Sequence, residues 1–147
     1  MAQLDTLIAN LPADVPAGQN TLRDVLAIAR RVAAARIAVT RGRQQEALRD
    51  LREAVRLEDG LAYDEPSNWF FPVRHVLGAE LLRAGFASEA ERVYREDLGI
   101  HPHDGWALCG LTQALEAEGR RASAHAARAK FRREWSHATV AISASAF

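Results

Sequence analysis

The sequence predicts an all-α protein whose helices form short pairs, and three observations support this. Alanine occurs 29 times among the 147 residues, and arginine supplies 18 of the 19 basic side chains. Both are strong helix formers, whereas the β-branched residues that favour strands are sparse. Apolar side chains recur at helical spacing, and glycines stand where helical stretches end. Hydrophobic residues make up 48% of the chain, which is enough for one folded domain over 1–147.

A short N-terminal helix and two longer ones are predicted first. An amphipathic stretch over 4–11 and a loop containing proline and glycine form an N-terminal segment over 1–20. Thr21 and Asp24 have the spacing of a capping box, which begins the next helix. Gly42 ends that helix, and another follows it. The side chains expected to be buried by this pair are Val25, Ile28, Val32, Ala35, Val39, Ala47, Leu48, Leu51, Ala54 and Val55.

Glycines and capping residues mark the remaining helices. Ser88 and Glu91 have the spacing of a second capping box, and Asp104 is placed to cap the helix that begins near Gly105. The glycines expected at helix C-termini, in the left-handed conformation, are Gly85, Gly99 and Gly119.

The chain repeats itself at an interval of 34 residues. Gly85 and Gly119 are 34 residues apart, and so are Ala90 and Ala124. Gly42 and Ala47 also stand 43 residues before Gly85 and Ala90, which is the same interval plus nine residues. A helix–turn–helix period of 34 residues is typical of tetratricopeptide repeats.

The middle copy resembles the tetratricopeptide-repeat family most closely. Its matching residues are Leu77, Gly78, Leu81, Gly85, Ala90, Tyr94 and Pro102. Arg74 departs from the pattern, which favours tryptophan there. The third copy has Thr112 for the glycine and Arg128 for the aromatic residue, and the first copy matches least. We expect Gly78 to face Ala90 where the two helices of the middle pair cross.

The resemblance implies a right-handed α-solenoid of about three repeats with terminal capping helices. The predicted repeats are 28–61, 71–104 and 105–138, with an insertion over 62–70 and a tail over 139–147. Each pair leaves an apolar face that only the next pair covers, so about three repeats are needed for stability. The stretches 62–74 and 93–98 also give the chain a resemblance to the C-terminal part of longer bacterial tetratricopeptide proteins.

In that family the first helix of each pair lines a concave groove, so the resemblance implies that a peptide or protein partner binds there. The candidate groove residues are Arg36, His75, Trp106 and Gln113. The family's clamp for C-terminal carboxylates requires lysine and asparagine where this chain has Val32 and Arg36, so chaperone tails are not expected partners. The alternative is that these side chains are only solvated.

The insertion over 62–70 places aromatic side chains beside carboxylates. Tyr63 and Trp69 are therefore candidates for a second recognition surface. Alternatively, Trp69, Phe70 and Phe71 fold back as a plug between the first two repeats, because three aromatic side chains in water would favour aggregation.

The sequence predicts no active site and no cofactor. His101, His103 and Asp104 lie close enough to bind a transition metal adventitiously, but Asp104 is expected to cap a helix, so a physiological metal is not expected. Cys109 has no base at helical spacing, so we do not expect a catalytic thiol. We expect a non-catalytic protein.

Charge and hydropathy argue against two classes of partner. The chain has 19 basic and 19 acidic residues, which does not favour nucleic acid or a membrane surface. The longest uncharged run, 135–147, is shorter than the roughly 20 residues that span a bilayer. The first residues lack the features of a signal peptide, so a cytoplasmic protein is expected.

The alternative function is structural self-association. Residues 61–104 carry four basic and eight acidic groups, whereas 105–147 carry six and three. A weak homo-oligomer held by these opposite charges would be sensitive to salt. The apolar contact expected for a tighter one is Trp135, Val140, Ile142 and Phe147.

Overall fold

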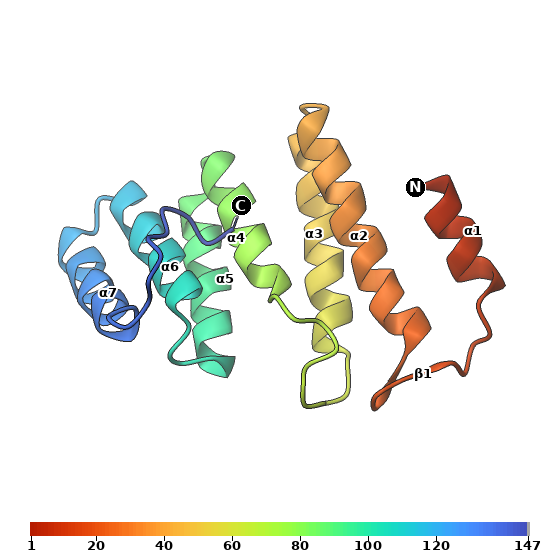
Figure 1. Cartoon of the computed structure of the whole chain (residues 1–147). Helices are drawn as coiled ribbons and strands as arrows, with labels where there is room; N and C mark the ends of the chain where they lie inside the picture. Colours follow the sequence, from red (N-terminus) through yellow and green to blue (C-terminus); the bar gives the residue numbers. More distant parts are fainter. Residues whose placement is uncertain (147) are drawn as a thin grey trace. The chain divides into compact units, whose positions relative to one another are not determined.

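The computed structural model describes residues 1–146, and α-helices dominate this part of the chain (Figure 1). Its seven helices are α1 (Ala2–Asn10), α2 (Leu22–Thr40), α3 (Gln44–Asp59), α4 (Val73–Arg83), α5 (Ala87–Ile100), α6 (Gly105–Ala117) and α7 (Arg121–Glu134). Two short antiparallel strands, β1 (Pro16–Ala17) and β2 (Asn20–Thr21), form the one sheet described. The all-α prediction is confirmed.

The chain divides into two compact units, Met1–Val73 and a second that begins at Arg74. In the first unit, α2 and α3 form a helical hairpin, and α1 packs against α2. The capping box at Thr21 is confirmed: its hydroxyl accepts from the Asp24 backbone N–H, and the Asp24 carboxylate accepts from the Thr21 N–H. Gly42 closes the hairpin with a φ of +69°.

The core of the first unit consists mainly of small and aliphatic side chains. The buried residues are Ile28, Ala35, Ala38, Ala47, Leu48, Leu51 and Ala54. Val25, Val32, Val39 and Val55, which were also expected to be buried, are only half-buried. Four of these seven buried residues are alanines, whose small side chains favour close packing of helices.

The second unit is built around Tyr94 of α5. An added Cβ at Gly78 of α4 would lie 2.3 Å from Tyr94 Cζ, and one at Gly110 of α6 would lie 2.1 Å from the same atom. The Tyr94 ring therefore occupies the space that two missing side chains leave on either side of it. Tyr94, and not Ala90 as predicted, is the side chain nearest to Gly78.

In the second unit, the predicted helix ends are confirmed at three places and wrong at two. Gly85 and Gly119 have φ values of +81° and +72°, and Asp104 Oδ1 accepts from the Ala107 backbone N–H at 2.8 Å. Gly99, however, lies inside α5, whose last residue is Ile100 and whose C-cap is His101.

The second predicted capping box is also wrong. The turn at Gly85 lets α5 begin at Ala87, so Phe86 is the N-cap and Ser88 lies within the first turn. Glu91 instead accepts hydrogen bonds from Arg95, one turn later, and from Arg120, which precedes α7.

The glycines beside Tyr94 give a direct stability test. Gly78→Ala and Gly110→Ala should each destabilise the protein by about 1–3 kcal/mol, because the new methyl group must displace a buried ring. Gly99→Ala is the matched control: its Cβ meets nothing within 4 Å, so the gain in helix propensity should stabilise the protein by about 0.5–1 kcal/mol. Urea denaturation measures all three, and equal stability of Gly78→Ala and wild type would contradict this packing.

Candidate functional site

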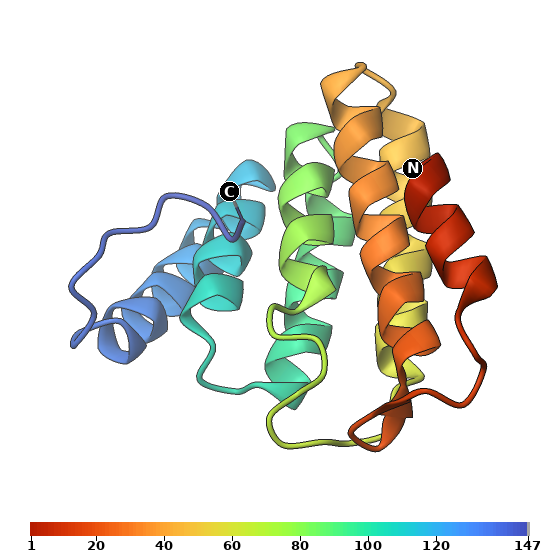
Figure 2. The ribbon, with the colours of Figure 1, turned by 45° about the vertical axis from the view of Figure 1, so that its right-hand side comes forward.

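Residues 135–146, which we call the tail segment, follow α7 as turns and bends and return over α6 towards α4 (Figures 1 and 2). The tail segment begins with Trp135, whose ring stacks on Phe131 and meets Trp106 edge to face at 5.6 Å between ring centroids. The Trp135 Nε1–H donates to the carbonyl of Val140 at 2.7 Å. This contact turns the chain back along the helices.

Ser145 joins the tail segment to the core of the second unit. Its Oγ lies 2.9 Å from the carbonyl oxygen of His75 and 2.5 Å from the hydroxyl of Tyr94. A serine hydroxyl has one hydrogen, and a carbonyl can only accept, so Ser145 donates to His75 and Tyr94 donates to Ser145. Burial raises the pKa of the Tyr94 phenol, which keeps this donor protonated.

Gln113 of α6 holds the backbone of the tail segment. Its side-chain amide donates to the carbonyl of Ser143 at 2.5 Å. Beside this contact, α6, α7 and the tail segment line a partly open pocket of about 250 Å³. The pocket is lined by Cys109, Thr112, Gln113, Glu116, Arg128, Phe131, Arg132, Ile142 and Ser143.

Cys109 faces this pocket but is poorly suited to act as a nucleophile. Burial raises the pKa of the Cys109 thiol, which keeps it protonated, and the thiolate is the reactive form.

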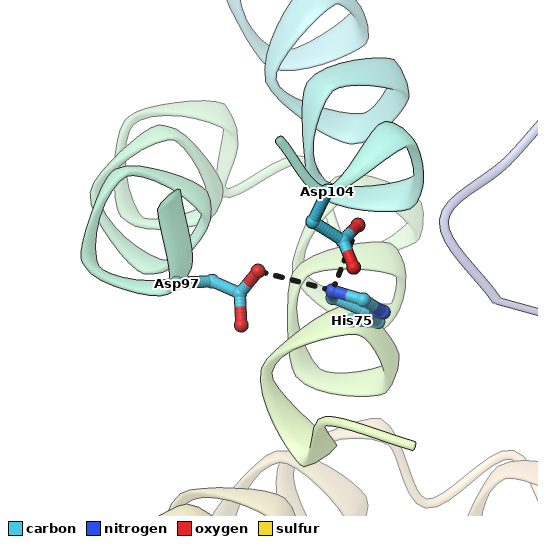
Figure 3. A group of neighbouring side chains, drawn as sticks. All are labelled: His75, Asp97 and Asp104. Atoms are coloured by element: carbon cyan, nitrogen blue, oxygen red, sulfur yellow. Dashed lines mark hydrogen bonds and ion pairs between the residues drawn. The ribbon is translucent and has the colours of Figure 1, made fainter. Parts of the chain in front are cut away.

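A second feature of this unit is a buried group of polar side chains, shown in Figure 3. The His75 Nε2 atom of α4 lies 3.1 Å from Asp97 Oδ2 of α5 and 3.4 Å from Asp104 Oδ1, just before α6. His75 is 1% exposed and Asp97 is fully buried. The other oxygen of Asp97, Oδ1, lies 3.2 Å from His101 Nδ1. Three segments of the chain thus direct their polar atoms to one point.

The predicted groove residues have different surroundings in the structure. Gln113 holds the tail segment, and Trp106 is half-buried against Trp135. The prediction that His75 lines an exposed wall is wrong, because its ring is turned into the buried polar group. Arg36 is exposed on α2, in the first unit.

The insertion forms an ordered loop with exposed aromatic side chains. The Asn20 side-chain amide donates to the carbonyl of Ala62 and accepts from its backbone N–H. The Asp64 carboxylate accepts from the Gln19 N–H at 2.9 Å. Tyr63 is 80% exposed, whereas Trp69 is half-buried. Phe70 is 88% exposed, so the predicted three-residue plug is wrong for this side chain.

Sequence reasoning missed Ser145 and Asp97. Asp97 could have been found, because it follows Ala90, Val93 and Tyr94 on the buried stripe of α5, where a carboxylate needs a partner. No local pattern distinguishes Ser145 from the other serines near it.

Within the part of the chain that the structure describes, no helix is both long and apolar enough to cross a membrane. No family model, no curated protein and no solved structure matches the chain.

The anchor at Ser145 can be tested by removing one hydroxyl. Ser145→Ala should destabilise the protein by about 1–3 kcal/mol, because it leaves the buried Tyr94 hydroxyl without its acceptor. Ser143→Ala, which keeps the carbonyl that Gln113 binds, should change stability by less than about 0.5 kcal/mol. Tyr94→Phe should lower the free energy of unfolding less in the Ser145→Ala variant than in the wild type, because the hydrogen bond is already absent from that variant. Strict additivity in urea denaturation would show that the two hydroxyls do not interact.

Proposed function

We propose that the chain is a non-catalytic, tetratricopeptide-like module that binds a peptide segment of a protein partner along α6. The helical hairpins α2–α3 and α6–α7, the positive φ values of Gly85 and Gly119, and the 34-residue interval between the first residues of α5 and α7 support this proposal. The complete superhelical stack of three repeats and a cytoplasmic location belong to the same proposal.

The observation that carries the proposal is the position of the tail segment. A non-helical stretch of the chain already lies on α6, and Gln113 binds its backbone carbonyl while Ser145 enters the core. Hydrogen bonds to the main chain of a peptide are one way in which protein surfaces bind peptide segments. The tail segment therefore serves as a model of the ligand.

The tail segment is also suited to be displaced. Its polar contacts to the helices are hydrogen bonds, each worth only about 0.5–1.5 kcal/mol net, and much of 136–141 is exposed. Covalent attachment nevertheless gives it a millimolar effective concentration. A partner peptide must therefore bind more tightly than the tail segment does, or bind when the tail segment has opened.

Self-association remains the second candidate, and Val140 favours it. Val140 is 60% exposed and belongs to the apolar contact predicted for an oligomer. Trp135 and Ile142 are instead half-buried against neighbours in their own chain, and Phe147 lies outside the described residues. A second copy would have to exchange tail segments with the first to use them.

The peptide-binding surface can be tested by removing residues 139–147 from the chain and supplying them as a separate peptide. A variant that ends at Ala138 should bind a fluorescent peptide of residues 139–147, measured by anisotropy. Gln113→Ala in that variant should weaken binding about 5- to 10-fold, as expected for one lost hydrogen bond. Gln45→Ala, an exposed glutamine on α3, is the matched control.

Two outcomes would contradict the proposal. One is a helical, folded truncated variant that does not bind the peptide at millimolar concentration. The other is binding that Gln113→Ala leaves unchanged. A full-length chain that elutes as a dimer in 0.5 M salt and separates into monomers with Ser145→Ala would favour exchange of tail segments between copies.

A further inference from the structure

We propose that His75, Asp97 and Asp104 form a binding site for a first-row divalent transition-metal ion such as Zn²⁺. This proposal does not rest on the proposed peptide-binding function. In the sequence, only His101, His103 and Asp104 stood close enough to suggest a metal site, and no physiological metal was expected there. The fold replaces two of these residues with His75 of α4 and Asp97 of α5 (Figure 3).

The distances among the three side chains fit such an ion. Zn²⁺ binds histidine nitrogen and carboxylate oxygen at about 2.0–2.2 Å in tetrahedral sites, which places neighbouring ligand atoms about 3.3–3.6 Å apart. Here the Nε2 atom of His75 is 3.1 Å from Asp97 Oδ2 and 3.4 Å from Asp104 Oδ1, and all three atoms lie within 4.8 Å of one another. Movements of the three side chains by a few tenths of an ångström to about 1 Å would bring their ligand atoms to the separations of a zinc site.

The charges also favour a cation at this point. Two carboxylates face the same imidazole nitrogen, and that nitrogen carries at most one hydrogen, which cannot make a good bond to both oxygens. An ionised Asp97, which is fully buried, is costly unless it is paired or coordinates a metal. A divalent cation would neutralise both Asp97 and Asp104, and His75 Nε2 would donate its lone pair to it.

Two of the three ligands are held in place by a further hydrogen bond: Asp97 Oδ1 contacts His101 Nδ1, and Asp104 accepts from the Ala107 N–H. The backbone carbonyl of His75 accepts from Ser145, which anchors the turn of α4 that carries the ring. Such outer contacts orient the ligands of metal sites in proteins. The side chains of Asp104 and His101 are 21% and 49% exposed, which gives an ion a route to the site and leaves a fourth position for water.

The set of donor atoms limits which ion fits. Imidazole and carboxylate together suit Zn²⁺ and its first-row neighbours. Ca²⁺ takes six to eight oxygen ligands and Mg²⁺ prefers octahedral oxygen coordination. A site with one nitrogen and two carboxylates does not provide either arrangement.

The test uses the full chain without a histidine tag, after treatment with a chelator. Isothermal titration with Zn²⁺ should give one site per chain, and Co²⁺ should give the visible absorption bands of a tetrahedral complex. Binding to the folded state should also raise the melting temperature. His75→Gln and Asp97→Asn should abolish the site, and His101→Gln should weaken it about 10- to 100-fold. His125→Gln, an exposed histidine on α7, should have no effect.

Three results would overturn the proposal: no stoichiometric binding, binding that survives His75→Gln, or binding that disappears with His103→Gln, which would indicate adventitious capture at the exposed turn. Nitrogen NMR of the wild-type histidines decides the matter even if the variants do not fold. Zn²⁺ must shift the Nε2 signal of His75, and a shift confined to other rings would exclude it. None of these readouts depends on peptide binding.

Discussion

The second unit depends on the fit of one tyrosine between two glycines. The Tyr94 ring occupies the positions that a Cβ atom would take at both Gly78 of α4 and Gly110 of α6, so it limits how these two helices pack against α5. Because protein interiors are close-packed, the ring fits here only because these two neighbouring positions lack side chains. Its hydroxyl then requires a partner, and Ser145 supplies one. The position of the tail segment is thus a consequence of the packing of α5.

The helices could be predicted because the rules that begin and end them act over a few residues. The capping box at Thr21 and the left-handed glycines at 42, 85 and 119 were identified correctly for this reason. The same rules failed where two of them competed. The turn at Gly85 determined where α5 begins, so the spacing of Ser88 and Glu91 had no capping role. Glycine is common at the ends of helices, so Gly99 was expected to end α5, but the helix continues past it to Ile100.

The candidate site could be predicted only in part, because its contacts join residues distant in sequence. Helical spacing placed Gln113 on an accessible face, and that expectation agrees with its bond to Ser143, 30 positions later. Spacing alone placed His75 on the same face, but Asp97, 22 positions later, draws its ring into the interior. The periodicity of a helix indicates which residues share a face. It does not indicate whether a polar side chain on that face will find a buried partner.

His75 links the two features of this unit. Its carbonyl holds Ser145 of the tail segment, while its ring faces Asp97 and Asp104. A metal ion at the ring would fix the first turn of α4, and this turn carries the carbonyl to which the tail segment is bonded. If both proposals hold, the two sites are thermodynamically linked, and the factor by which metal changes peptide affinity equals the factor by which peptide changes metal affinity. A metal that strengthens the hold on Ser145 would oppose displacement of the tail segment and so weaken binding of a partner peptide.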